Sequence, residues 1–282
     1  MIDQAAELRL LMGGRPRGQN LMCPSIAITS GKGGVGKTNI AVNLGLAIAE
    51  TGARVTLLDA DWGLANADVV LGVKPLCDMR HVLTGARDME QATCVGPLGL
   101  RLVAGASGIA ELANMAPNER ERLMSEVARL GKQTDLIIID TAPGISDGVI
   151  DLATSVDGTL VVTTPEPTSL TDAYAFVKVA LQRHPEARIE LIVNMATDRK
   201  QAEEVACGFA RVTERFLGRS IPLAGFVCTD PRVGNAVHRQ SPFLLSYPHS
   251  VAANCVRRLG RDLLMNYVKP AASPVYRPAV AV

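Results

Sequence analysis

Gly31-Lys32-Gly33-Gly34-Val35-Gly36-Lys37-Thr38 decides the fold, because this stretch fits the pattern G-x-x-x-x-G-K-[ST] of a phosphate-binding loop. In such a loop, backbone N–H groups surround the phosphates of a nucleoside triphosphate. The lysine of the pattern reaches the β- and γ-phosphates, and the final hydroxyl binds Mg²⁺. Closely spaced glycines let the backbone approach the phosphates without clashes from Cβ atoms. The stretch therefore predicts a nucleoside triphosphate site formed by Gly33, Gly34, Val35, Gly36, Lys37 and Thr38.

The residues on either side supply the strand and the helix that a phosphate-binding loop needs. Residues 25–30 are a short, largely apolar and β-branched run. After the loop, Ile40, Leu44 and Ile48 recur at helical spacing until Gly52, a residue type that often ends a helix. A glycine-rich turn between a strand and a helix is the alternative, and the complete pattern favours the phosphate site.

The composition excludes several classes of protein. The chain has 282 residues, of which 48% are hydrophobic but only 4% aromatic, so its core must be aliphatic. A net charge of +1 gives no overall attraction to nucleic acid or to acidic membranes. The six cysteines are scattered without a C-x-x-C pair, which favours reduced thiols over a zinc or iron–sulfur site. No signal peptide is evident, and no window reaches the roughly 18 apolar residues that span a bilayer. We therefore expect a soluble, cytoplasmic protein.

Changes in composition divide the chain into three regions. Residues 1–20 predict a short helix tethered by a linker of glycines and charged residues. Residues 21–270 alternate apolar strands with amphipathic helices, which is typical of a mostly parallel, twisted sheet with helices on both faces. Residues 271–282 contain two prolines, and we expect them to be disordered. The predicted fold class is α/β, with one large domain.

The elements of that domain are predicted from apolar periodicity. The helices begin or end at residues with a known preference for those positions, and two of them, 168–183 and one starting near 197, open with threonine hydroxyls that predict caps. The other clear helices are 117–131 and 251–268, and the last one places its apolar residues on one face. The predicted strands are 25–30, 54–59, 100–104, 135–140, 159–164, 188–195 and 223–227.

Acidic side chains follow two of the predicted strands. Asp61 comes just after residues 54–59, and Asp140 ends residues 135–140. Open α/β sheets bind ligands at the carboxyl ends of their strands, so both carboxylates should lie near the phosphate-binding loop. Asp140 has the form of the aspartate that holds Mg²⁺ in phosphate-loop enzymes, although a lone aspartate at a strand end is often only a surface residue. For Asp61 we favour a role in holding the attacking water, whereas Asp68 fits a helix cap or turn better.

Lys32 is unusual because it places a second ammonium inside the loop, five residues before Lys37. One interpretation is that it only adds solvated charge. The other is that it crosses a dimer interface and neutralises charge that develops on the partner's nucleotide during phosphoryl transfer.

Together these motifs resemble the MinD/ParA family of deviant Walker-A ATPases. The resemblance rests on Lys-Gly-Gly-Val-Gly-Lys-Thr at 32–38, Asp-Ala-Asp at 59–61 and Asp-Thr-Ala-Pro-Gly at 140–144, and it covers residues 23–268. It implies the P-loop NTPase fold, ATP and Mg²⁺ as cofactors, and slow ATP hydrolysis by a homodimer that forms in the ATP state.

The resemblance also implies roles for single residues. Lys32 would act in trans across the dimer, Asp61 would position the attacking water, and Asn194 would read the edge of the adenine. Without the resemblance, Asn194 is only a polar residue at the end of a strand. Cys228 stands where the family usually has a proline near the base, so the chain departs from the family pattern at the implied contact with adenine.

Two longer stretches are similar to the flagellar-number regulators (the FlhG/FleN type) within that family. They are Asp-Trp-Gly-Leu-Ala-Asn-Ala-Asp at 61–68 and Pro-Glu-Pro-Thr-Ser-Leu-Thr-Asp-Ala-Tyr at 165–174. The branch implies control of flagellum number and of flagellar gene expression, with a flagellar signal-recognition-type GTPase and a flagellar transcription activator as partners. The N-terminal residues that resemble the GTPase-stimulating segment of these regulators are Asp3, Gln4, Leu8 and Arg9.

Other functions of the same family are the alternatives. Division-site placement and DNA or cargo partitioning use related ATPases. DNA binding needs a basic surface, and a small cluster that could contribute to one is Arg211, Arg215 and Arg219. A solvated helical face explains these arginines better, so DNA is not expected as a partner. The family also implies peripheral contact with the inner face of the plasma membrane, but residues 271–282 make a poor interfacial helix. A metal-cluster carrier would need paired cysteines, which the sequence lacks.

Overall fold

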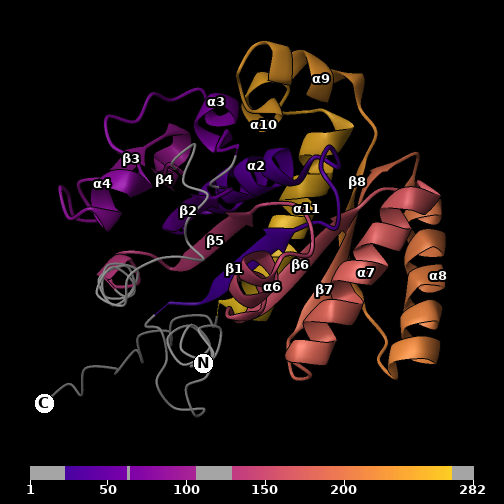
Figure 1. Cartoon of the computed structure of the whole chain (residues 1–282). Helices are drawn as coiled ribbons and strands as arrows, with labels where there is room; N and C mark the ends of the chain where they lie inside the picture. Colours follow the sequence, from indigo (N-terminus) through magenta and orange to yellow (C-terminus); the bar gives the residue numbers. More distant parts are fainter. Residues whose placement is uncertain (1–22, 62–63, 106–128, 269–282) are drawn as a thin grey trace, which may run out of the picture.

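The computed structural model describes residues 23–61, 64–105 and 129–268, shown in colour in Figure 1. Several predictions made from the sequence lie outside these residues. They concern the N-terminal helix and linker at 1–20, with Asp3, Gln4, Leu8 and Arg9, most of the helix at 117–131, and the tail at 271–282.

An eight-stranded sheet forms the centre of the described part, in the order β3-β4-β2-β5-β1-β6-β7-β8. All seven predicted strands are present within one or two residues, and every pairing among them is parallel. The prediction missed β3, a three-residue edge strand that pairs antiparallel with β4 and has no buried residue to mark it in the sequence. The strands are β1 Ser25–Thr29, β2 Val55–Ala60, β3 Thr93–Val95, β4 Arg101–Val103, β5 Leu136–Thr141, β6 Gly158–Thr163, β7 Ile189–Ala196 and β8 Leu223–Cys228.

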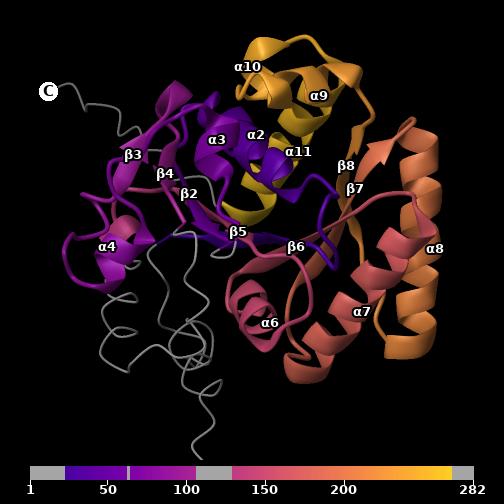
Figure 2. The ribbon, with the colours of Figure 1, turned by 45° about the horizontal axis from the view of Figure 1, so that its top comes forward.

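Helices cover both faces of the sheet (Figures 1 and 2). In β1, Ile26 and Ile28 join a core cluster with α2 and α11, while Ala27 between them joins a second cluster with α6, α7 and α8. This alternation is what a strand buried on both faces requires. The helices are α2 Lys37–Ala49, α3 Ala67–Leu71, α4 Met79–Leu83, the 3₁₀ turn η1 Pro97–Gly99, α6 Asp147–Thr154, α7 Pro167–Arg183, α8 Arg199–Leu217, α9 Pro231–His238, α10 Phe243–Ser246 and α11 Val251–Tyr267.

The predicted threonine caps of α7 and α8 are wrong. Glu166 precedes α7 without a side-chain cap, and the hydroxyl of Thr168 instead accepts a hydrogen bond from Lys32. At α8 the carboxylate of Asp198 accepts from the backbone N–H of Gln201, and the hydroxyl of Thr197 bonds to the Gln201 side chain. A carboxylate is the better acceptor beside the positive end of a helix, which explains why Asp198 displaces its neighbour.

The last helix, α11, is anchored at its end by Tyr267. The hydroxyl of Tyr267 donates to Oε1 of the buried Glu190 at 2.8 Å, and the guanidinium of Arg188 lies 4.0 Å from the centre of its ring. A Cβ atom on Gly158 would lie 2.1 Å from the Tyr267 hydroxyl oxygen. The ring therefore fills the space that any side chain at position 158 would need. Throughout the described ranges, no helix combines the length and the apolar character that crossing a bilayer demands.

Candidate functional site

The site lies at the carboxyl edge of the sheet, where the order of the strands brings distant segments together. β5 and β6 flank β1, which leads into the loop at 31–38, and β2 lies beyond β5. In register, Asp59 of β2 is the neighbour of Asp140 of β5. Because these strands are parallel, the acidic residues after β2 and β5 meet on one side of the loop, and residues after β6 and β7 meet on the other.

The loop itself has the open backbone that phosphates require. Gly34 and Gly36 have φ values of 82° and 86°, which an L side chain rarely adopts, and no atom lies within 4 Å of a Cβ built on Gly33 or Gly34. The loop is held from behind by Asn194, whose Nδ2 donates to the Val35 carbonyl at 2.8 Å. The backbone at Gly33 and Gly34 is therefore exposed and free of neighbouring atoms that would block phosphates.

At the end of the loop, Lys37 and Asp140 form a buried ion pair. Lys37 Nζ lies 2.7 Å from Asp140 Oδ1, and the two side chains are 7% and 0% exposed. Burial raises the pKa of Asp140, and the negative charge of Asp61 adds to this effect, while Lys37 and the Thr38 hydroxyl oppose it. The other oxygen, Oδ2, is buried without a hydrogen-bond partner. A carboxylate oxygen left unsatisfied in this position is suited to a cation.

Asp59 organises the backbone around Asp61, although it was not among the residues predicted for the site. Its Oδ1 accepts from the backbone N–H of Asp61, and its Oδ2 accepts from those of Asn66 and Ala67, each at 3.0 Å. The Asp59 side chain is almost completely buried. This carboxylate therefore holds the backbone of Asp61, Asn66 and Ala67 close to the end of β2. The only signal in the sequence was the density of polar residues after that strand.

The pH dependence of folding stability should report on Asp59. Burial raises its pKa from 3.8 to about 6, with Asp140 adding to the shift and the three N–H groups opposing it. The unfolded chain then loses this proton at a lower pH than the folded chain, so stability falls as pH rises between those values. The fall from this one group amounts to at most about 3 kcal/mol. We expect urea unfolding between pH 4 and pH 7 to show a smaller fall in Asp59→Asn than in the wild type; equal slopes would contradict the assignment.

Asp61 lies at the same edge, 9% exposed. Its Oδ1 accepts from the backbone N–H of Leu64 at 3.2 Å. This bond uses one oxygen, and the charge is close enough to Asp140 to affect its pKa. Asp61 is thus held beside the predicted cation site, as a residue that positions water must be.

Lys32 is held on the other side of the loop by residues of the same chain. Its Nζ lies 3.2 Å from Glu166 Oε2 and 3.0 Å from Thr168 Oγ1, both at the start of α7. The Lys32 and Glu166 side chains are 31% and 68% exposed, so water weakens this pair. Lys32 is therefore not simply solvated, and its ammonium is placed at the rim of the site.

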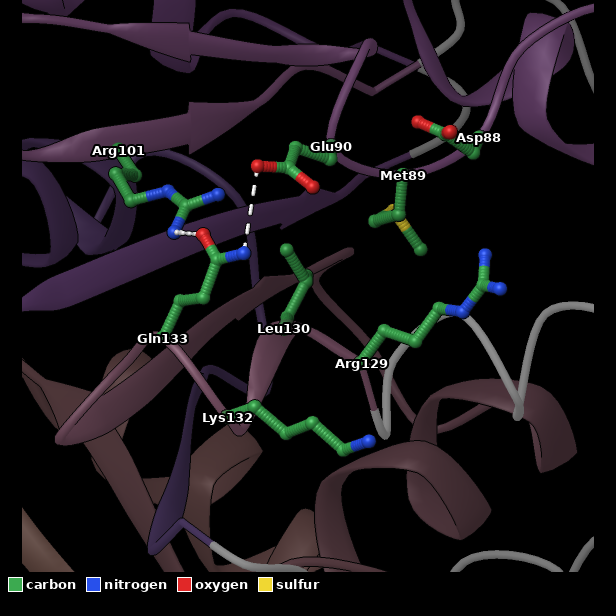
Figure 3. A pocket seen from close by; sticks show the side chains of 8 residues that line it. All are labelled: Asp88, Met89, Glu90, Arg101, Arg129, Leu130, Lys132 and Gln133. Carbon is green, nitrogen blue, oxygen red and sulfur yellow. Dashed lines mark hydrogen bonds between the residues drawn. The ribbon is translucent and has the colours of Figure 1, made fainter.

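A hollow of about 370 Å³ lies elsewhere, near the amino ends of β4 and β5. Figure 3 shows that Gln133 bridges its walls, since its amide accepts from Arg101 at 2.9 Å and donates to Glu90 at 3.3 Å. The hollow contains no residue of the phosphate-binding loop. Two of its charged side chains, Arg101 and Glu90, are bonded to Gln133, and we assign the nucleotide to the loop.

The residues around the loop fit a magnesium nucleotide. Backbone of Gly33–Thr38 and the Lys37 ammonium would hold phosphates, and Thr38 with Asp140 would hold the cation, which supplies charge neutralisation during phosphoryl transfer. A parallel sheet with this loop after β1 and acids after β2 and β5 defines a P-loop NTPase.

Comparisons with known proteins place the chain within that class. The model of the ParA family, described as "NUBPL iron-transfer P-loop NTPase", matches residues 22–264. The chain therefore belongs to the ParA family. It is an ATPase of the MinD/ParA type.

Individual relatives and structures agree with this assignment. Antiactivator FleN of Pseudomonas aeruginosa is 38% identical over 228 residues, which is 81% of each chain. Flagellum site-determining protein YlxH of Helicobacter pylori is 38% identical over 176 residues, or 62% of this chain and 59% of the relative. The cell division ATPase MinD of Pyrococcus furiosus superposes with a TM-score of 0.69 at 25% identity, covering 86% of this chain and 99% of MinD. The predicted fold class and family resemblance are confirmed.

Proposed function

We propose that this protein is an ATP-driven dimerisation switch. Binding of ATP and Mg²⁺ would close two copies over their nucleotides, partners would engage the dimer, and slow hydrolysis would release it. The observation that carries the proposal is the pair of lysines at one loop. Lys37 is buried against Asp140 inside the site, whereas Lys32 lies at the rim, held only by partly exposed groups.

The two lysines support different steps. The phosphates would compete with Asp140 for Lys37, which frees the carboxylate for the cation. Lys32 would have to leave Glu166 and Thr168 to reach the nucleotide of a second copy. Asn194 is proposed to read the adenine edge, and its hydrogen bond to Val35 would keep it beside the loop in that role.

Glu166 should set how readily the dimer forms. Replacing it with alanine removes one partner that keeps Lys32 within its own protomer. Since exposed ion pairs contribute about 0.2–1 kcal/mol, we expect dimerisation at an ATP concentration lower by a factor of roughly 1.4 to 5. Light scattering across an ATP titration measures this, with the exposed Glu186→Ala as the matched control. An unchanged or weaker dimer in Glu166→Ala would mean that the contact does not oppose pairing.

We further propose a role in regulating flagellum number, placement and gene expression. The names of two relatives, an antiactivator and a flagellum site-determining protein, support this assignment. The proposed partners are a flagellar signal-recognition-type GTPase, contacted through Asp3, Gln4, Leu8 and Arg9, and a flagellar transcription activator. Peripheral contact of the ATP-bound dimer with the inner face of the plasma membrane stays a prediction.

Pull-down of the full chain and of a form lacking residues 1–20, each in ATP and in ADP, tests this role. Recovery of the GTPase only with the N-terminal residues present is the expected result. Recovery of division-site or partition proteins instead would favour the alternative branch of the family.

DNA is not proposed as a partner, because two of the three candidate arginines, Arg215 and Arg219, make local contacts. The guanidinium of Arg215 lies 5.3 Å from the ring centre of Phe216, and Arg219 donates to the Pro185 carbonyl. Iron transfer, named in the description of the family model, is not proposed either, since the sequence has no C-x-x-C pair.

A further inference from the structure

Met195 has a backbone conformation that its residue type disfavours. Its φ is +58°, and among the described residues only Leu98 and Gln240 share a positive φ without being glycine. Met195 is also the single exposed residue of β7, at 45% exposure, in a strand otherwise buried along its length. A strained conformation persists only where the surrounding structure enforces it, and such positions concentrate at functional sites.

A β-bulge enforces this conformation. Asn194 pairs with Val227 and Ala196 pairs with Cys228, so the register between β7 and β8 shifts at the residue between them. Beyond the shift, the backbone N–H of Thr229 donates to the Ala196 carbonyl at 2.8 Å. Bulges redirect a side chain next to a site, and here the redirected side chain is Met195.

The bulge places an apolar group next to the phosphate-binding loop. A Cβ built on Gly36 would lie 3.8 Å from the Met195 terminal methyl and 2.5 Å from Asn194 Nδ2. Met195 and Asn194 thus lie on the same side of the loop, one exposed and one buried. Two other large apolar residues near this edge, Leu64 and Ile145, are exposed, but neither has a strained backbone.

We propose that the Met195 thioether packs against the face of the purine base of the bound nucleotide. A flat aromatic base needs a van der Waals partner, and a polarizable, flexible thioether makes favourable contacts with aromatic rings. Met195 is then a positioning residue for the base, with no part in phosphate or metal binding. The inference depends on the proposed nucleotide site at the loop.

Calorimetric titration of Met195→Gly and Met195→Leu tests the proposal, using Mg-ATP and magnesium tripolyphosphate, which has no base. Glycine accepts a positive φ, so Met195→Gly should fold at least as stably as the wild type, which thermal unfolding checks. We expect the affinity of Met195→Gly for Mg-ATP to be about five- to tenfold lower than that of the wild type. Its affinity for tripolyphosphate, measured by displacement, should change less than twofold. Met195→Leu keeps an apolar group and should lose less than threefold.

Two results would overturn the proposal. Equal weakening of both ligands in Met195→Gly would mean that Met195 acts through the loop, and unchanged ATP affinity would mean that the base lies elsewhere. Failure of the wild type to bind either ligand would instead reject the nucleotide site itself.

Discussion

Replacing Lys37 with alanine is expected to abolish ATP binding and to lower the free energy of unfolding by about 3 kcal/mol. The second effect follows because Asp140 is fully buried and Lys37 is its ion-pair partner at 2.7 Å. Burial raises the pKa of Asp140, and the Lys37 ammonium opposes this effect most strongly. In Lys37→Ala, only the weaker contact with the Thr38 hydroxyl is left to oppose it. The loss should therefore be smaller at low pH, where Asp140 can take up a proton.

Calorimetry with Mg-ATP and urea unfolding measure the two effects of Lys37→Ala separately. The double variant Lys37→Ala/Asp140→Asn removes the isolated charge, so it should regain part of the stability but none of the ATP binding. Lys200→Ala is a matched control, since this lysine is 85% exposed on α8 and should change neither property. An unchanged free energy of unfolding for Lys37→Ala at neutral pH would show that the ion pair with Asp140 does not stabilise the fold.

Replacing Asp61 is expected to block hydrolysis after ATP has bound. A residue that positions and activates water contributes about a hundredfold or more to kcat, so Asp61→Ala should turn over at least about a hundred times more slowly. The ATP dimer should then persist, because the step that releases it is lost. Steady-state phosphate release and light scattering in ATP measure both outcomes.

Asp61→Asn separates chemistry from structure. Its amide oxygen can still accept from the Leu64 N–H, so the local turn is kept while the negative charge is removed. It should be as slow as Asp61→Ala and as stable as the wild type. Asp68→Ala is the control on the same segment and should turn over normally. If Asp61→Ala hydrolyses ATP at the normal rate and stays monomeric, both the catalytic role of Asp61 and the proposed dimerisation switch are contradicted.

Local patterns in the sequence were sufficient to predict most strands of the sheet. The seven predicted strands lie in apolar runs that glycines, prolines and charges delimit clearly. β3 was missed because it is a short edge strand with no buried residue, whereas β4, equally short, contains buried apolar residues; α6 was missed because its eight residues follow a glycine-containing connection. The phosphate-binding loop was predictable because phosphate binding requires a backbone conformation that glycine allows. The spacing of the glycines in the sequence therefore indicates the loop directly.

Contacts that depend on strand order could not be predicted. Lys32 and Glu166 are 134 residues apart and meet only because β1 pairs with β6. Similarly, Asn194 reaches Val35 because β7 follows β6 in the sheet. The local sequence around each residue contains no trace of the other. Asp59 was passed over for a different reason: its three acceptor bonds are all to backbone, which any sequence could supply.

Tyr267 and Gly158 lie at the far end of the sheet from the loop, and their close packing has an evolutionary implication. The tyrosine ring occupies the volume of a side chain at 158, and its hydroxyl satisfies Glu190. Neither position can change alone without a cavity, a clash or an unpaired carboxylate. Across divergent homologues, substitutions at 158, 190 and 267 should consequently occur together. Their joint pattern would identify lineages in which the packing of the terminal helix against the sheet has changed.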